Sequence, residues 1–245
     1  MRVHALDTAK GLGILLVVFG HAWRGNYAAG LGISDPVFQA IDTAIYAFHM
    51  PLFFFLAGLL FWETLNKRSL KTLFPERLIR LLWPMALWTW IFLSVKLMAG
   101  QSANQPVGLA DVQWFPLPPY EHLWFLWALF LVQIFVAVVF ASSRWTSRVF
   151  RVLAGVIGLA LILILPFVDF QSDWFGAALQ HTPYFLMAIA LGWTVGMRPS
   201  GMLTGVGALL FCVFLFLAGL GQVDLAQSMV MVFCCLLYTS DAADE

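Results

Sequence analysis

Charged residues are scarce in this sequence. Lys, Arg, Asp and Glu make up 11% of its 245 residues, whereas hydrophobic residues make up 62%. A soluble domain has roughly 25% charged residues, so the composition excludes an ordinary soluble protein and indicates a membrane protein. The formal net charge is zero. We expect no nucleic-acid partner.

Cysteine is equally rare. The three cysteines, Cys212, Cys234 and Cys235, lie in apolar runs without the spacing of metal ligands. We therefore expect neither a disulfide framework nor a metal site. The sequence also has no internal repeat with a period of roughly 20–50 residues and no long linker, so we expect one transmembrane domain over residues 1–234.

Apolar runs of membrane-spanning length are abundant. A transmembrane helix needs roughly 20 residues, and a few of these runs are short or contain a proline. We predict an all-α fold, a polytopic transmembrane helical bundle with seven to eight spans. The runs cover residues 8–24, 43–62, 81–99, 122–141, 152–168, 178–197, 202–221 and those from 224 onward.

The connections between these runs alternate in charge. Basic residues gather at the N-terminus, in 62–80, in 142–151 and at Arg198, and acidic residues occupy the connections between them. A cytoplasmic N-terminus places eleven of the thirteen Lys and Arg residues in the cytoplasm, with Arg24 and Lys96 as exceptions. The positive-inside rule therefore predicts that orientation.

The first apolar run carries three ionisable side chains within DTAKGLGILLVVFGH, residues Asp7 to His21. Such groups inside a membrane are functional candidates because burying them is costly. Lys10 and His21 are eleven residues apart, which on a helix means nearly the same face and about 16 Å along the axis. Asp7 adjoins Lys10. Alternatively, Lys10 extends to the headgroups and His21 bonds to a neighbouring helix.

Three histidines are predicted to lie at one depth. In this orientation His21 is about 20 Å along the first helix, His49 is about 9 Å below the outer surface, and His122 opens the fourth helix at its outer end. Histidine transfers protons near neutral pH, which favours a shared polar site in the outer half; chance placement is the alternative. Pro51, close to His49, can free a backbone carbonyl there.

Two arginines mark the opposite side. Arg77 and Arg80 have the three-residue spacing that places side chains on one helix face. With Lys10 they would form a cationic entrance at the cytoplasmic end. The planar guanidinium group suits phosphate binding, whereas the simpler interpretation is that these arginines only follow the positive-inside rule.

Four motifs, in this order, carry a family resemblance: LDTAKGLGILLVVFGH, FHMPLFFFLAG, RLIRLLWP and HLWFLWALF. With them the chain resembles the membrane acyltransferase-3 family, and most of all its sugar O-acetylases related to fucose 4-O-acetylase. The similarity covers residues 1–234. This resemblance implies that the seven to eight spans belong to a fold of about ten transmembrane spans.

The resemblance implies an integral membrane O-acetyltransferase, an acyltransferase that transfers groups other than aminoacyl groups. Such an enzyme moves an acetyl group from cytoplasmic acetyl-CoA to a hydroxyl of a surface-polysaccharide sugar or its lipid-linked precursor. The implied setting is the bacterial inner membrane, as a multi-pass protein. The implied partners are acetyl-CoA, a sugar or lipid-linked glycan acceptor and membrane lipid, with no metal.

The family's site residues map onto this chain one by one. Its signature of a basic residue, a ten-residue gap and a histidine maps onto Lys10 and His21, although much of the family has Arg where this chain has Lys10, which lacks the bidentate contact of Arg. The family's Arg-x-x-Arg motif maps onto Arg77 and Arg80. The expected catalytic residues are His21, Lys10, His49 and His122, the CoA-binding residues are Lys10, Arg77 and Arg80, and the supporting residues are Asp7 and Trp124.

The implied mechanism makes His21 a general base on the acceptor hydroxyl, or a residue that briefly carries the acetyl group. One alternative is a transporter or flippase for a polar or polyprenyl-linked substrate, since intramembrane Lys and His suit a proton-coupled path. Another is an O-acyltransferase for a small molecule. Dependence on CoA separates both enzymes from the transporter.

The last eleven residues, CLLYTSDAADE, differ from the rest of the chain. They resemble a translated sequencing adapter. We expect residues 235–245 to be non-native, the acyltransferase-3-like domain over 1–234 to be incomplete at its C-terminus, and further helices to follow in the native protein.

Overall fold

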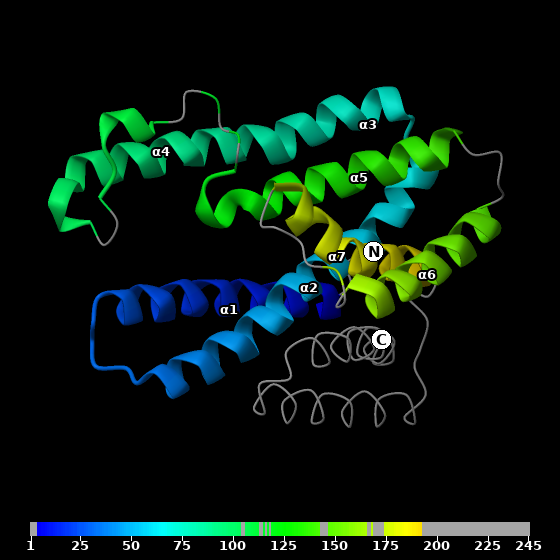
Figure 1. Ribbon diagram of the computed structural model, residues 1–245. Helices are drawn as coiled ribbons and strands as arrows, with labels where there is room; N and C mark the ends of the chain where they lie inside the picture. The colour runs from blue at the N-terminus through cyan, green and yellow to red at the C-terminus, as the bar shows by residue number, and fades with distance from the viewer. Residues whose placement is uncertain are drawn as a thin grey trace. The chain divides into compact units, whose positions relative to one another are not determined.

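Figure 1 shows a computed structural model of the protein. All regular elements in the described part are helical, as predicted, and no strand occurs there. The expected spans over 202–221 and from 224 onward, and the tail 235–245, lie outside the described residues. The structure describes residues 4–103, 106–112, 115, 117, 119–142, 147–165, 168 and 174–192.

Helices account for most of this described part. Short 3-10 turns lie at Gly100–Ser102, Leu109–Asp111 and Glu121–Leu123, and a π-helical turn lies at Leu78–Leu82. The α-helices are α1 (His4–Ala28), α2 (Asp35–Lys67), α3 (Leu70–Arg77), α4 (Trp83–Ala99), α5 (Trp124–Ser142), α6 (Ser147–Ile164) and α7 (Trp174–Leu191).

Four helical segments among the described residues are long and apolar enough to cross a membrane: Asp35–Lys67, Leu70–Ser102, Trp124–Ser142 and Ser147–Ile164. They correspond to four of the predicted spans and support a membrane protein. Helices α1 and α7 are also present where spans were predicted, but they are not among these four. The predicted number of seven to eight spans therefore stays a prediction.

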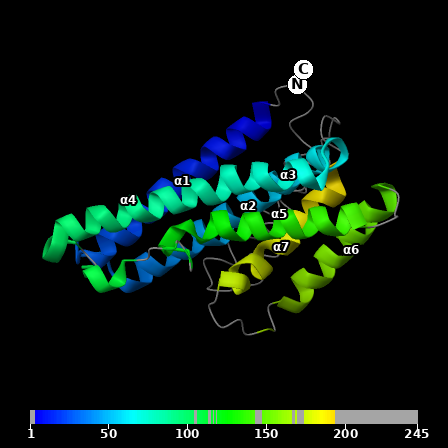
Figure 2. The same cartoon turned by 90° about the horizontal axis from the view of Figure 1, so that it is seen from above.

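The basic connection 62–80 is helical over most of its length, which the apolar runs did not predict. Helix α2 continues to Lys67 and α3 begins at Leu70. Figure 2 shows α3 and α4 as one long helix, with α5 alongside. Polar residues can extend a helix beyond its apolar run because helix formation is cooperative, so hydropathy alone underestimates the helix length.

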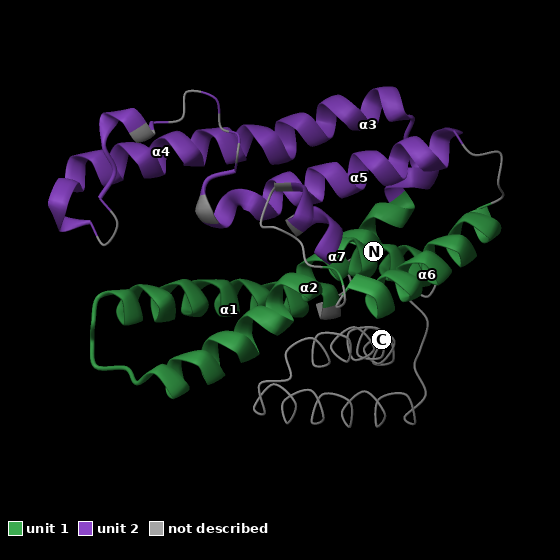
Figure 3. Ribbon diagram, viewed as in Figure 1, with its two compact units in different colours: residues 1–63, 146–168, 181–245 green, residues 64–145, 169–180 purple. Residues whose placement is uncertain are grey.

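The chain divides into two compact units (Figure 3), which are described separately. Unit 1 comprises residues 1–63, 146–168 and 181–245, and unit 2 comprises 64–145 and 169–180. The described part of unit 1 thus contains α1, most of α2, α6 and the larger part of α7. Unit 2 contains α3, α4 and α5.

The aromatic motif of α2 forms the core of unit 1. Phe54, Phe55 and Phe61 are fully buried, as is Phe185 of α7, whose ring lies 5.5 Å from that of Phe61. Gly58 allows this packing: a Cβ there would lie 2.5 Å from the carbonyl oxygen of Phe185. The motif is therefore a packing surface inside the protein.

Two glycines on one face of α1 set its contact with α2. A Cβ at Gly13 would lie 2.8 Å from the Phe53 ring, and one at Gly20 would lie 3.2 Å from the Tyr46 ring. The two glycines are seven residues apart, and so are their partners in the reverse order, as expected for antiparallel helices (Figure 1). Gly20 directly precedes His21, so its close contact with Tyr46 brings that ring next to His21.

In unit 2, the long α3–α4 helix packs on α5. Phe74 of α3 contacts Phe130 of α5 with the two ring centroids 6.0 Å apart. Thr89 is fully buried in α4, and its hydroxyl donates to the carbonyl of Met85 at 2.8 Å. This bond satisfies a polar group inside an apolar helix.

Candidate active site

His49 is held in one tautomer by its own helix. Its Nδ1 lies 2.7 Å from the carbonyl oxygen of Ile45, one turn earlier in α2. A carbonyl only accepts, so Nδ1 carries the proton and donates, and in the neutral imidazole Nε2 keeps its lone pair. His49 is 2% exposed. The residue therefore presents a fixed proton acceptor inside the protein.

The Tyr46 ring brings His21 and His49 into one cluster. It contacts His49 edge-on with the centroids 4.7 Å apart, and His21 of α1 edge-on at 6.4 Å. These two distances keep the imidazole rings within about 11 Å of each other. His21 is the more exposed of the two. Two histidines predicted to share a depth are thus neighbours around one aromatic ring.

The Tyr46 hydroxyl is an unusual group. Its oxygen is buried, and it has no hydrogen-bond partner among the described residues. A buried polar group without a partner is unfavourable by about 1–3 kcal/mol, and such groups call for an explanation. A hydrogen bond from this hydroxyl to a substrate group would be one such explanation.

An ion pair beside this ring joins α1 to α2. Arg24 donates from Nε and Nη2 to the two carboxylate oxygens of Asp42 at 2.6 and 2.7 Å. Its guanidinium carbon also lies 3.4 Å from the centre of the Tyr46 ring. Bidentate pairing fixes the plane of the guanidinium, so Arg24 and Asp42 together fix the Tyr46 ring.

Lys10 and Asp7 lie near the start of α1. Lys10 Nζ is 3.8 Å from an Asp7 carboxylate oxygen, and both side chains are partly exposed. The two side chains thus form an ion pair, although a pair this exposed contributes little stability. Helix α1 is uninterrupted from His4 to Ala28, so Lys10 and His21 are separated along its axis by about 16 Å.

The two arginines of the RLIRLLWP motif lie at the junction of α3 and α4. Arg77 ends α3 and is partly buried, whereas Arg80 lies in the π-helical turn Leu78–Leu82 and is exposed. Pro84 has no N–H to donate to the carbonyl of Arg80 four residues earlier. Because this turn is wider than an α-helical one, the three-residue spacing does not place Arg77 and Arg80 on one face as it would in an α-helix. Such π-turns occur frequently at functional sites.

Glu76 binds the neighbours of Arg77 and was not considered in the sequence. One carboxylate oxygen accepts from Arg68 Nη1 at 2.7 Å, and the other lies 3.1 Å from Arg80 Nη2. Arg80 is therefore already paired with a carboxylate. An incoming phosphate would have to compete with Glu76 for that guanidinium.

His122 and Trp124 lie at the start of α5 in unit 2. The His122 ring packs edge-on against Phe92 of α4 at 4.8 Å, and Trp124 packs edge-on against Phe125 at 6.5 Å. Because His122 belongs to the other unit, its predicted association with His21 and His49 stays a prediction.

Several residues of the site were missed by sequence reasoning. Arg24, Asp42 and Tyr46 were not considered as site residues. Two signals were available. Arg24 was an exception to the charge pattern, and Tyr46 precedes His49 by three residues and so shares its helix face.

Among the residues that the structure describes, no group of three or more His, Cys, Asp or Glu side chains could hold a metal ion. The described residues around Tyr46 form a polar cluster between α1 and α2, in which His49 presents a proton acceptor. The chain belongs to the acyltransferase-3 family. The Acyltransferase domain that defines this family matches residues 3–239. The family predicted from the four motifs is confirmed.

Two curated relatives resemble the chain. Nodulation protein NolL of Mesorhizobium japonicum is 28% identical over 202 residues, which are 78% of this chain and 49% of the relative. Nodulation protein NolL of Sinorhizobium fredii is 28% identical over 212 residues, which are 84% of this chain and 53% of the relative. The chain thus spans about half the length of these relatives. No solved structure matches it.

Proposed function

We propose that this protein is an integral membrane O-acetyltransferase that moves an acetyl group from cytoplasmic acetyl-CoA to a hydroxyl of a sugar or lipid-linked glycan. Membership of the acyltransferase-3 family supports acyl transfer. The observation that carries the chemistry is the His21–Tyr46–His49 cluster. The sugar acceptor rests on the resemblance of the four motifs to sugar O-acetylases, and the bacterial inner membrane rests on the same resemblance.

A neutral imidazole is the base that this reaction needs. The acceptor hydroxyl loses its proton to the imidazole as its oxygen attacks the thioester carbonyl. The new C–O bond forms, the C–S bond breaks, and the imidazolium returns the proton to the sulfur of CoA. His21 is the proposed base or transient acyl carrier. His49, whose Nε2 lone pair is fixed by the bond from Nδ1 to Ile45, is the proposed second proton acceptor.

The donor is proposed to bind through cations at the cytoplasmic side. Arg77 and Arg80 are the proposed contacts of the CoA phosphates, because guanidinium groups bind phosphate oxygens strongly. The sequence also predicts Lys10 for this role. The pantetheine arm has to cover a distance comparable to the roughly 16 Å between Lys10 and His21. Asp7 would keep Lys10 in place through the observed ion pair.

The decisive experiment uses the full-length protein in membrane vesicles with radiolabelled acetyl-CoA. Label should pass into lipid-linked glycan, and His21→Ala should abolish the transfer. A His21→Ala protein that transfers label at the normal rate would exclude the proposed mechanism. No transfer by a folded protein, with several glycan acceptors supplied, would favour transport or an acceptor outside the glycans.

The donor site is tested separately. Arg77→Ala should raise the KM for acetyl-CoA about tenfold, since a lost charged contact is worth roughly 1.5 kcal/mol or more, and should change the KM for the sugar much less. Lys71→Ala is the matched control, because Lys71 is an exposed cation of the same helix. An unchanged KM for acetyl-CoA in Arg77→Ala would exclude this assignment.

A further inference from the structure

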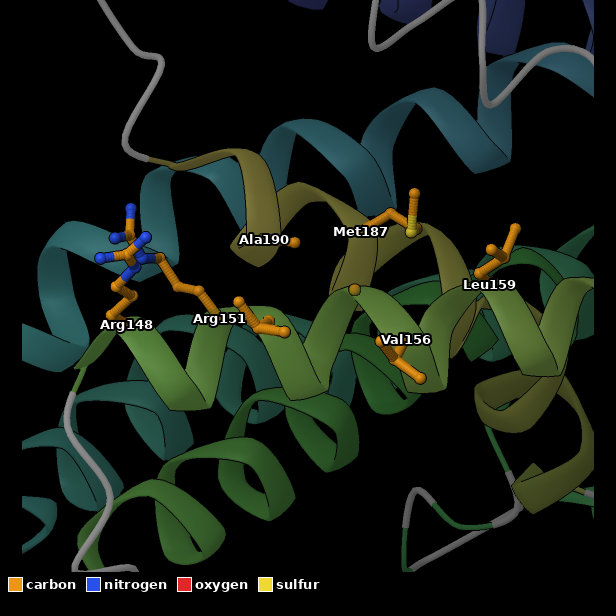
Figure 4. Close-up of a pocket in the computed structure, with 8 residues that line it drawn as sticks. Arg148, Arg151, Val156, Leu159, Met187 and Ala190 are labelled. Carbon is orange, nitrogen blue, oxygen red and sulfur yellow. The ribbon is translucent and has the colours of Figure 1, made fainter.

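Unit 1 contains a groove of about 720 Å³ along α6 and α7 (Figure 4). None of the residues described above as site residues lines it. Its lining is amphipathic, with two arginines at one end and apolar side chains along the rest, and none of its described lining residues is acidic. The residues that carry the argument are Arg148, Arg151, Val156, Leu159, Met187 and Ala190.

The two arginines lie together at the N-terminal end of α6. They are three residues apart and so share a helix face, and Figure 4 shows their guanidinium groups gathered at the same end of the groove. The Arg151 guanidinium also lies 5.3 Å from the centre of the Trp62 ring. Tryptophan concentrates at the headgroup level of membranes, so this contact places the cationic end at that level.

The remainder of the groove extends from this end along the helix axis. Val156 and Leu159 are five and eight residues beyond Arg151, which on an α-helix is about 8 and 12 Å further along the axis. Both side chains are exposed. An apolar surface of this length, at this depth, suits the upper part of an acyl chain.

Small residues bring α6 and α7 close together beneath the groove. A Cβ at Gly155 would lie 3.1 Å from the Cβ of Ala190, and one at Gly158 would lie 3.1 Å from Cγ of Met187. Small residues allow close helix packing within a membrane. The groove thus lies over a closely packed pair of helices, which suits one chain of a lipid.

We infer that this groove binds one anionic phospholipid of the cytoplasmic leaflet. Arg148 and Arg151 hold the phosphate, and the apolar surface of Val156, Leu159 and Met187 holds the acyl chain. Charge complementarity assigns the headgroup, because the two guanidinium groups give this end of the groove a positive charge that attracts an anionic lipid. A free phosphate would use the arginines alone and would leave the apolar surface uncovered. This site does not depend on the proposed acetyl transfer.

Native mass spectrometry of the full-length protein in detergent tests the inference, with phosphatidylglycerol as the probe and glycerol 3-phosphate as the headgroup alone. The variant Arg148→Gln/Arg151→Gln should retain phosphatidylglycerol about tenfold less than the unmodified protein does. The control Lys67→Gln/Lys71→Gln loses the same charge from the other basic connection and should retain the lipid. Val156→Trp fills the apolar part and should also weaken the lipid adduct.

Equal retention by the arginine variant and the unmodified protein would overturn the inference. Equal losses in the arginine and lysine variants would also overturn it, because charge alone would then explain the binding. Glycerol 3-phosphate bound as strongly as the lipid would exclude the role of the acyl chain. If the arginine variant fails to fold, Val156→Trp decides: unchanged lipid retention in that folded variant contradicts the site.

Discussion

The guanidinium carbon of Arg24 lies 3.4 Å from the centre of the Tyr46 ring. Arg24 and Lys96 are the two cations that the charge pattern places on the side away from the other eleven. Lys96 has an aromatic partner as well, since its Nζ lies 5.3 Å from the centre of the Tyr120 ring. A cation over an aromatic face is stabilised by about 0.5–2 kcal/mol. Both exceptions to the positive-inside pattern are therefore cation–π pairs.

Tyr46→Phe should separate activity from stability. The variant keeps the ring that contacts Arg24 and His49 but removes a buried hydroxyl without a partner among the described residues. We expect equal or higher stability, by up to about 1 kcal/mol, and acetyl transfer reduced about tenfold if the hydroxyl bonds the substrate. Thermal unfolding and kcat/KM measure the two effects. Lower stability with full activity would contradict this role.

Exchanging the two charges between α1 and α2 should show that Arg24 and Asp42 act as a pair. Arg24→Asp and Asp42→Arg should each destabilise the protein, by about 1 kcal/mol because the pair is partly exposed. The double variant should recover most of the loss. Unfolding temperatures of the three variants form the test, and a double variant less stable than either single one would contradict the pairing.

His49→Asn distinguishes the two nitrogens of His49. The asparagine amide can still donate to the carbonyl of Ile45, but no group remains in place of the Nε2 acceptor. We expect acetyl transfer to fall by about 10²-fold or more, with the unfolding temperature almost unchanged. Transfer in vesicles and thermal unfolding provide the readouts. Normal turnover in this variant would contradict the role of His49 and leave His21 as the proposed base of the cluster.

Gly58→Ala tests the packing of α2 on α7. The added methyl would meet the Phe185 carbonyl oxygen at 2.5 Å and the Ala188 Cβ at 2.8 Å, so we expect a loss of about 1–3 kcal/mol. Gly11→Ala is the matched control: nothing lies within 4 Å of a Cβ there, and alanine favours a helix by up to about 1 kcal/mol. If both variants unfold at the same temperature, the described helix contact is wrong.

The positions of most described helices could be predicted from the local sequence, but some helix ends could not. The predicted runs 81–99 and 122–141 correspond to Trp83–Ala99 and Trp124–Ser142, because hydropathy is a local property. The run 43–62 was too short, since α2 begins at Asp35. Its first turns mix apolar residues with Asp35, Gln39 and Asp42 and lie outside the apolar run, yet Pro36 is well placed for the start of a helix.

The sequence by itself determined a helical membrane protein, its acyltransferase-3 family and the roughly 16 Å between Lys10 and His21, because each follows from composition, ordered motifs or the helix repeat. Only the tertiary structure decided that Tyr46 of α2 contacts His21 of α1 and that Arg24 of α1 pairs with Asp42 of α2. Contacts between helices depend on which faces pack together. Packing is a property of the folded chain and cannot be read from one helix at a time.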